Sequence, residues 1–581
     1  MDAWAKTLRS EIWKMEQPWQ TLPWRRLKLI RTKLRAIGKK LQNGITSFCG
    51  GAWLTLLLAS ALWAAQPAVD DPIPARTQGD GPYARVVLRN VTIVNGTGAP
   101  AQGPYDLVLV QDRIAEIRSI GTPGAIDASK RAERGEHEID LTGHYVLPGF
   151  VDTHAHLHSL AHEQKVPADY VLKLWMAHGV TSVREVGSHK PIEWLVGVKQ
   201  RSARNEIVAP RIDVYPMFHE ILETPINDAQ SARQAMREAK RRGADGIKFI
   251  SGEEDALYAA LDEAEKLGLR TTMHHSQGLV AYADVLQTSA HGLDSMEHWY
   301  GLPEAMFTDR ALQDWPGSYV NNDEQMRFGE AGRLWQQAAA PGSPAWNKVM
   351  DELLARRFVL SPTFTAYLTS RDFMRMSRAQ WHEEYTLPAL WDWYRPSRTN
   401  HGSYWFDWTT EREMAWRENY RLWMQFVNEY KNRGGTVTVG SDSGYIYNLY
   451  GFGYIQEMEL LREAGFSPLE VIHAATQAGA RTLGHEDQVG TIRVGRKADL
   501  VIVNGNPIEN LKLLFGTGAL RLNDASGQVE RVGGVVYTVK DGIIYDARKL
   551  RAEVRDMVAK QKAQRNIPPG PMKIETLDVS R

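Results

Sequence analysis

LPGFVDTHAHLH, residues 147–158, combines a short apolar strand with a run of histidines. The strand is predicted over residues 149–152 and continues into His154-Ala155-His156. Successive side chains of a strand point to opposite faces, so His154 and His156 point the same way. Both imidazoles can therefore reach one metal ion at about 2 Å from each nitrogen. This stretch predicts a metalloenzyme.

The overall composition and charge exclude some kinds of metal site and some kinds of binding partner. Of the 581 residues, 43% are hydrophobic and 24% are charged, which is ordinary for a globular protein. The length allows several domains or one large barrel with additions. A formal net charge of +0 argues against a nucleic-acid partner. The single cysteine, Cys49, lies near the N-terminus, so the chain after it holds no disulfide or thiolate zinc site.

The N-terminal region divides into a basic arm, residues 1–44, and an uncharged apolar segment, residues 45–65. The apolar segment predicts a secretory signal or one membrane anchor, with a buried apolar helix as the alternative. Because the positive charge stays on the cytoplasmic side, we expect the remaining chain to be periplasmic or otherwise extracytoplasmic, secreted or membrane-anchored. Residues 66–83, rich in Pro, Gly and Asp, predict a linker.

Two β-rich flanks surround a long middle region. Residues 84–148 and 489–550 contain short alternating runs and predict two parts of one small β-sandwich. Residues 149–488 alternate strand candidates with amphipathic helices, and residues 551–581 follow as a C-terminal tail. The strand candidates are GFVDTH, GVTSVREVG (179–187), RIDVYPMF (211–218), GIKFISG (246–252), LRTTMHH (269–275), DSMEH (294–298), FVLSPTF (358–364) and TVTVGSD (436–442). This order predicts an α/β fold with a (β/α)8 TIM barrel.

An insertion over about residues 299–430 holds more than half of the 19 tryptophans. They include Trp391, Trp393, Trp405 and Trp408. One interpretation is an aromatic lid or substrate wall over the barrel mouth. The other is an ordinary helical subdomain with an aromatic core.

Several predicted strands end in residues able to bind a metal. These candidates are His154, His156, Lys248, His274, His298 and Asp442. Catalytic groups of (β/α)8 barrels gather at the C-terminal ends of the strands, so we expect the candidates to converge. His275 competes with His274, which is preferred because residues 271–273 lead into it. Burial of the Lys248 ammonium is costly and predicts a partner or a function. A helix N-cap is the alternative role for Asp442.

These motifs resemble the amidohydrolase superfamily over roughly residues 84–550. The matching motifs are LPGFVDTHAH, GVTSVREVG, GIKFISG, the His274 strand, DSMEH, VGSDSG and the segment 473–507. The subgroup that the chain resembles is the imidazolonepropionase-like one, with Xaa-Pro dipeptidases and related carboxypeptidases. The resemblance implies two divalent metal ions, usually zinc, although manganese, iron and cobalt suit the same donors.

The resemblance also implies a role for each candidate. His154, His156 and Asp442 would bind the more buried ion, and His274 and His298 the second. Lys248 would carry a CO2-derived carbamate that bridges both ions. Metal-activated hydroxide would attack the carbonyl, and Asp442 would move the proton from the water to the leaving amine.

Two further residues are expected near the substrate. Tyr367, in SPTFTAY, would bind an oxyanion or a substrate carboxylate, with a packed tyrosine as the alternative. His219, just beyond the third strand, is a further pocket candidate.

The predicted activity is hydrolysis of a C–N amide or peptide-like bond in a small molecule, such as a dipeptide or an N-acyl amino acid. A lactonase or phosphotriesterase on the same centre is one alternative. A catalytically dead, membrane-tethered binding protein is another. The sequence leaves open whether the chain forms a homo-oligomer.

Overall fold

The structure is a computed structural model that describes residues 71–157, 166–188, 190–397, 401 and 407–572. These described residues belong to one compact unit. The predicted basic arm and the apolar segment 45–65 lie outside the described residues. Within the described part of the chain, no helix combines the length and the apolar character needed to cross a membrane.

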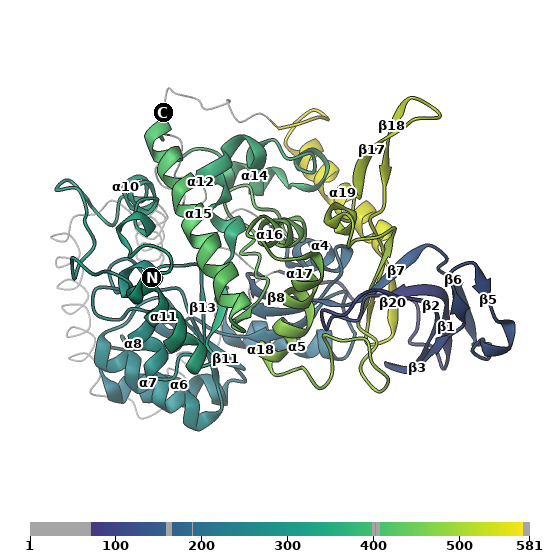
Figure 1. Cartoon of the computed structure of the whole chain (residues 1–581), viewed down its shortest axis with the longest axis horizontal. Helices are drawn as coiled ribbons and strands as arrows, with labels where there is room; N and C mark the ends of the chain where they lie inside the picture. The colour runs from purple at the N-terminus through teal and green to yellow at the C-terminus, as the bar shows by residue number, and fades with distance from the viewer. Residues whose placement is uncertain (1–70, 158–165, 189, 398–400, 402–406, 573–581) are drawn as a thin grey trace, which may run out of the picture. The chain divides into compact units, whose positions relative to one another are not determined.

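Eight parallel strands follow one another along the middle of the chain, and each lies in a segment predicted as a strand. They are β8 (Phe150–Ala155), β9 (Val180–Glu185), β10 (Arg211–Val214), β11 (Gly246–Phe249), β12 (Arg270–Met273), β13 (Ser295–Glu297), β14 (Val359–Ser361) and β15 (Thr436–Val437). They form a three-stranded sheet, β10-β9-β8, and a five-stranded sheet, β11-β12-β13-β14-β15. Figure 1 labels β8, β11 and β13 among the helices of this region. Because all pairs are parallel, the C-terminal ends of the eight strands share one side.

Main-chain contacts connect the two sheets at both edges. Beyond β10, Met217 pairs with Lys248 of β11 in an isolated parallel bridge. On the other edge, the Thr153 amide of β8 donates to the Val439 carbonyl just after β15, at 3.0 Å. These contacts stop short of the continuous ladder of a closed barrel. The region is therefore a mixed α/β fold with eight parallel strands.

Amphipathic helices connect the strands, and α6 (Ala229–Arg241) illustrates why they form. Asp228 caps its N-terminus by accepting a hydrogen bond from the Ser231 amide at 2.8 Å. Its buried residues recur at helical spacing and are Ala232, Ala235, Met236 and Ala239. The other connecting helices are α4 (Ala168–Ala177), α5 (Ile192–Ala203), α7 (Glu254–Leu267), α8 (Val285–Ala290), α16 (Phe452–Glu463), α17 (Pro468–His473) and α18 (Gly479–Leu483).

The insertion between β13 and β15 folds around tryptophans. Its helices are α9 (Leu302–Ala305), α10 (Glu324–Ala331), α11 (Pro344–Ala355), α12 (Phe364–Ser377), α13 (His382–Tyr385), α14 (Pro388–Tyr394) and α15 (Thr410–Asn432). The fully buried tryptophans are Trp299, Trp335, Trp346, Trp416 and Trp423. Trp391 and Trp393 are also buried, Trp408 is half-buried against the same core, and Trp405 lies outside the described residues. The buried tryptophans therefore belong to a hydrophobic core that the insertion shares with the parallel strands.

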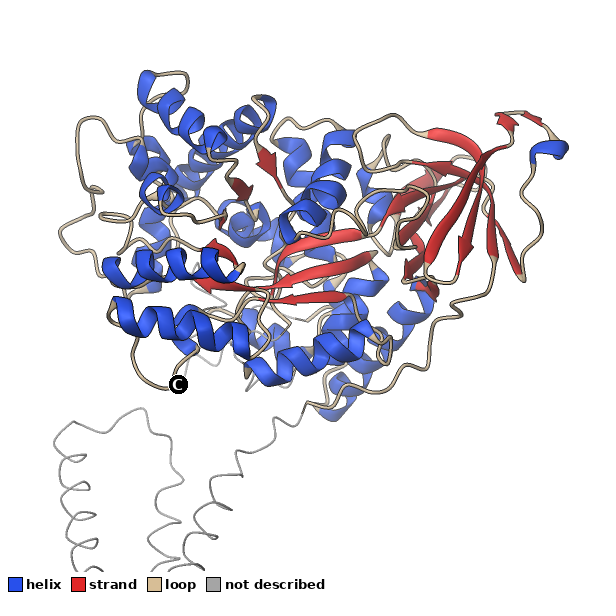
Figure 2. Ribbon diagram, turned by 90° about the horizontal axis from the view of Figure 1, so that it is seen from below, coloured by secondary structure: helices blue, strands red, loops and turns tan. Residues whose placement is uncertain are grey.

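A further sheet combines strands from both flanks of the chain, and Figure 1 shows the purple-blue strands β1 and β2 beside the yellow β20. Figure 2 shows this sheet as the red strands at the right of the view. Its order is β20-β19-β16-β7-β1-β2-β3, and β6 pairs with β1. The strands are β1 (Val86–Ile93), β2 (Gln102–Val110), β3 (Arg113–Ser119), β6 (His137–Asp140), β7 (His144–Pro148), β16 (Leu500–Asn504), β19 (Val535–Lys540) and β20 (Ile543–Asp546). At its centre, β16 pairs antiparallel with β7, with Leu500 opposite Pro148. Apolar residues of both flanks thereby share one core.

Smaller elements complete the described chain. The two-residue strands β4 (Gly121–Thr122) and β5 (Ala125–Ile126) form a short hairpin, and β17 (Ala519–Asn523) with β18 (Gln528–Val532) forms a longer one. Helix α19 (Ala547–Gln564) packs against α4 and contains residues 551–564 of the predicted tail.

Candidate metal centre

The two histidines of the HxH motif face each other at the end of β8. His154 lies in β8 and His156 just after it, and both side chains are buried. Strand alternation places both rings on one side, as predicted. Their Nε2 atoms lie 3.1 Å apart. Two ring nitrogens at this distance can share a proton or a metal ion.

Asp442 completes a three-atom set with these histidines. It follows β15 and has a left-handed backbone with φ of +47°, and its amide donates to the His154 carbonyl at 2.9 Å. Its Oδ1 lies 3.3 Å from His154 Nε2 and 3.1 Å from His156 Nε2. Two ligands of one tetrahedral ion, each about 2.0–2.1 Å from it, are separated by about 3.3 Å. The donor set and its spacings therefore fit one divalent metal ion.

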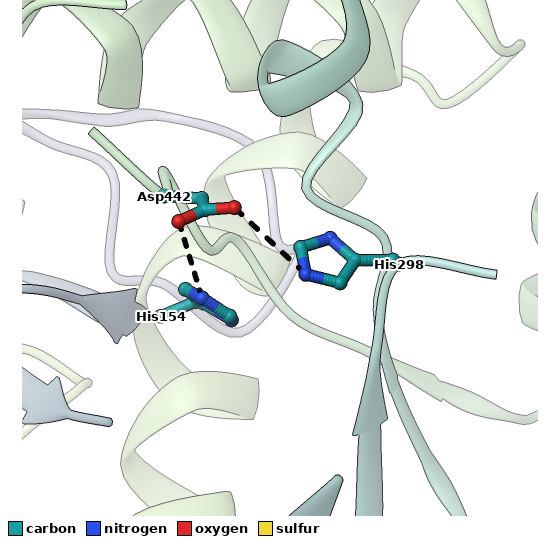
Figure 3. Close-up of side chains that lie close together, drawn as sticks. All are labelled: His154, His298 and Asp442. Atoms are coloured by element: carbon teal, nitrogen blue, oxygen red, sulfur yellow. Dashed lines mark ion pairs between the residues drawn. The ribbon is translucent and has the colours of Figure 1, made fainter. Parts of the chain in front are cut away.

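His298 approaches the other oxygen of Asp442 (Figure 3). It follows β13, and its Nε2 lies 3.8 Å from Asp442 Oδ2. Its Nδ1 contacts the Thr363 hydroxyl at 2.5 Å, which fixes the orientation of the ring. Ligand atoms of His154, His298 and Asp442 all lie within 4.8 Å of one another. Asp442 therefore lies between the HxH pair and a second group of histidines.

His274, rather than His275, belongs to this second group. The His274 ring lies 4.5 Å from the His298 ring, centroid to centroid, and contributes to the same cavity wall. The His275 ring turns away and contacts the Thr288 hydroxyl through Nε2 at 2.9 Å. The structure thus separates two neighbouring histidines that the sequence left as competitors.

Lys248 of β11 reaches the cavity with a buried ammonium group, and its partner is a carboxylate that the sequence analysis did not single out. Lys248 Nζ lies 2.7 Å from Oε2 of Glu297, which is fully buried in β13. Oε1 of Glu297 accepts a hydrogen bond from Arg184 at 3.3 Å and another from the Thr272 hydroxyl. His154 Nδ1 lies 3.7 Å from the same Oε1. One carboxylate therefore faces two buried cations and a candidate metal ligand.

Burial sets the protonation of this cluster. Desolvation lowers the pKa of His154 to about 4 and that of His298 to about 3, so both rings are neutral and able to bind a metal near pH 7. Burial also lowers the pKa of Lys248, against the opposing attraction of Glu297. For Glu297, burial alone would raise the pKa, but the charges of Lys248 and Arg184 hold it well below the usual range.

A cavity of about 250 Å³ opens onto these side chains. All six predicted ligands and Tyr367 line it. Tyr367 is buried, and its ring meets that of His298 edge-on at 5.4 Å. The insertion also contributes Arg327, Phe328 and His401 to the wall. The wall of the cavity thus comes partly from the insertion, although none of the insertion's described tryptophans lines it.

His219 does not join the cluster, contrary to the prediction. It lies in the turn η4 (Phe218–Glu220), where its side chain is 52% exposed and its Nε2 lies 3.8 Å from Glu220. It is absent from the cavity wall. The short turn after β10 directs Phe218 inward and His219 into solvent. We therefore remove His219 from the candidate site.

The family comparison agrees with the motifs. Residues 424–544 match the amidohydrolase family, and this segment contains Asp442 and extends through β16 to β20. An adenine deaminase from Brucella suis biovar 1 (strain 1330) is 44% identical over 54 residues, which cover 9% of this chain and 8% of that protein. The chain thus matches less than a tenth of that relative's length. The resemblance to amidohydrolases is confirmed.

Solved structures share the fold. A Xaa-Pro dipeptidase with methionine bound in its active site aligns with a TM-score of 0.53 and 18% identity, over 80% of this chain and 100% of that one. A bottromycin amidohydrolase aligns with a TM-score of 0.54 and 17% identity, over 88% and 95% of the two chains. At these identities the likeness concerns the fold alone.

Proposed function

We propose that this chain, whose residues 424–544 match the amidohydrolase family, is a metal-dependent hydrolase that cleaves C–N amide or peptide-like bonds of small molecules. One observation carries the proposal. Nε2 of His154, Nε2 of His156 and Oδ1 of Asp442 lie 3.1 to 3.3 Å apart at a cavity. This spacing matches the ligand separation of a tetrahedral ion, and the cavity gives a substrate access to it.

We extend the proposal to two ions. His274 and His298 would hold the second ion, next to the Oδ2 side of Asp442. A carbamate on Lys248 would replace a costly buried cation with a bridging anion. Its nitrogen would keep one N–H, which can still donate to Glu297. Imidazole and carboxylate donors suit zinc, and they also suit manganese, iron or cobalt.

The side chains of this chain have distinct tasks in such a reaction. Divalent ions at these ligands would supply Lewis acidity, which acidifies water and polarises a carbonyl. Asp442 has a carboxylate that faces the cavity, and it would accept a proton from the attacking water and return it to the leaving amine. Tyr367 lies across the same cavity, where its hydroxyl would donate to the developing oxyanion.

We also propose a substrate class. The amino acid found in the related dipeptidase supports dipeptides or N-acyl amino acids as substrates.

We further propose a closed barrel and an extracytoplasmic location. The cross-sheet contacts at Met217 and Val439 support closure of the eight strands into a (β/α)8 barrel. The apolar character of residues 45–65 supports export or membrane anchoring. Cell fractionation, with mass spectrometry of the mature N-terminus, tests this location.

A substrate panel with metal analysis tests the activity. We expect one to two equivalents of bound metal and hydrolysis of at least one N-acyl amino acid or X-Pro dipeptide. Lactones and phosphotriesters in the same panel test the alternative chemistry. Asp442→Asn should lower kcat/KM by at least about 10³-fold, because it removes a ligand and the proton carrier. Asp487→Asn, at a side chain that is 99% exposed, is the matched control and should leave the rate unchanged.

Two results would count against the proposal. A metal-loaded protein that cleaves none of the amides would favour the ester or phosphoryl alternative. A protein with well under one equivalent of metal and no hydrolysis would favour a binding protein without catalysis.

A further inference from the structure

A second cavity, which we call the basal cavity, lies at the opposite ends of the parallel strands. Its wall includes Arg270, Ser295, Val359 and Thr436, which begin β12, β13, β14 and β15. The candidate metal ligands lie at or beyond the other ends of these strands. The basal cavity has a volume of about 560 Å³, within the range of small-molecule sites. It is therefore separate from the metal centre.

The basal cavity is lined by far more positive than negative charge. Arg184, Arg270, Arg357 and Arg481 contribute guanidinium groups, and Asp294 is the single carboxylate of its wall. Asp294 is already engaged, because its Oδ2 accepts hydrogen bonds from the Thr271 amide at 2.8 Å and from the Thr271 hydroxyl at 2.9 Å.

Two of the four guanidinium groups form no ion pair within 4.0 Å among the described residues, although Asp294 attracts Arg270 at longer range. Arg184, at the floor, pairs with Glu297 at 3.3 Å, and Arg481 lies 3.7 Å from Glu486. In contrast, no described carboxylate lies within 4.0 Å of Arg270 or Arg357. Neither side chain donates a hydrogen bond within the described part of the chain. Their ten N–H donors (five on each) face the cavity or solvent.

The backbone leaves room for the Arg270 guanidinium at the rim. Gly484 ends α18 with a left-handed φ of +73°, and a Cβ at this position would lie 1.9 Å from Arg270 Nη2. Only glycine therefore leaves this guanidinium in place. Arg270 is exposed, and its guanidinium lies beside Gly484 at the rim, where a ligand in the cavity can reach it.

We propose that the basal cavity binds a phosphate-bearing small molecule through Arg270, Arg357 and Arg481. Guanidinium groups present paired donors that match phosphate oxygens, and such charge-assisted bonds are among the stronger ones in proteins. The volume accommodates more than inorganic phosphate, so a phosphomonoester or a diphosphate fits the site better than the free ion. This site is independent of the proposed hydrolysis and lies at the other ends of the strands.

Calorimetric titration of the purified, metal-loaded protein tests this site. The probes are inorganic phosphate, pyrophosphate and ribose 5-phosphate, at physiological salt. We expect saturable binding with one molecule per chain, and tighter binding of the two larger probes than of phosphate. Arg270→Gln should weaken binding by at least about 10-fold, and combination with Arg357→Gln should weaken it further. Arg204→Gln, at a surface guanidinium paired with Glu206, is the matched control and should bind as the wild type does.

A second variant separates loss of the basal site from misfolding and from binding of the probes at the candidate metal centre. Gly484→Ala should displace the Arg270 guanidinium without removing its charge, and so should weaken binding by about as much as Arg270→Gln. Both variants should retain the wild-type metal content. Binding that survives Arg270→Gln and Arg357→Gln unchanged would overturn the proposal and assign the probes to the metal centre. The proposal would also be overturned if no probe binds saturably at 10 mM. The same holds if all anions bind equally at low salt and this binding is lost at physiological salt.

Discussion

Glu297→Gln is the substitution that tests the electrostatics of this fold most directly. Glu297 is fully buried and faces Lys248 at 2.7 Å and Arg184 at 3.3 Å. The amide keeps the shape of the side chain and removes its charge. Two buried cations then lose their common counter-ion. Removal of one partner of a buried ion pair costs about 3–5 kcal/mol.

The structure also predicts how this cost depends on pH. Without Glu297, burial disfavours the charged form of Lys248, so the folded variant holds it neutral. The unfolded chain keeps that proton up to a pKa of about 10.4, which makes deprotonation at pH 7 cost about 4.6 kcal/mol. The unfolded state thus binds more protons than the folded variant below this pKa. The destabilisation should therefore shrink by about 1.4 kcal/mol for each pH unit between 7 and 9.

Denaturant unfolding of metal-free protein at pH 7, 8 and 9 measures this effect as a difference between variant and wild type. Glu193→Gln is the control, because Glu193 pairs with Arg242 at the surface and should cost less than about 1 kcal/mol at any pH. A Glu297→Gln variant within 1 kcal/mol of the wild type at pH 7 would refute the reasoning. A cost that stays constant from pH 7 to 9 would show that Lys248 keeps its proton.

Three further predictions concern the metal centre. Lys248→Ala should reduce bound metal from two equivalents to one or fewer by elemental analysis, and full retention of two would exclude the bridging carbamate. Tyr367→Phe should lower kcat by at least about 10-fold with metal content unchanged, whereas an unchanged kcat would leave this residue a packed tyrosine. His154 and His298 have pKa values lowered to about 4 and about 3, so their folded rings take up protons only below these values. Protonation of these two rings should therefore cost no metal affinity between pH 7 and 5.5 in a competition titration, and a loss of about 100-fold per unit, as two rings taking up protons would give, would contradict the burial argument.

The parallel strands and most residues of the candidate metal centre could be predicted from local sequence pattern. Alternation alone places His154 and His156 on one side of β8, and the structure brings their Nε2 atoms to 3.1 Å. His274, His298 and Asp442 follow strands whose C-terminal ends share one side of the sheets. Convergence of such residues is a property of topology, which the order of strands and helices already indicates.

The parts that the sequence did not predict depend on tertiary contacts. Glu297, like Lys248, is a charged residue within an apolar strand. Its role as the shared counter-ion of Lys248 and Arg184 is visible only in the tertiary structure. His219 was misplaced because the turn after β10 decides which of two adjacent side chains faces inward. Arg327 reaches the cavity from a distant insertion, and no local pattern shows this.

The antiparallel pairing of β7 with β16 has a consequence for how the protein forms during synthesis. The ladder between β7 and β16 pairs Pro148 with Leu500. It cannot form until β16 has been synthesised, and by then the whole middle region has already left the ribosome. Contacts of such high sequence separation slow folding, because loop closure costs entropy before the pairing repays it. Until then, β7 is an open edge exposed to aggregation. The nascent chain should therefore depend on chaperones until its C-terminal strands emerge, and premature termination before β16 should yield an aggregation-prone fragment.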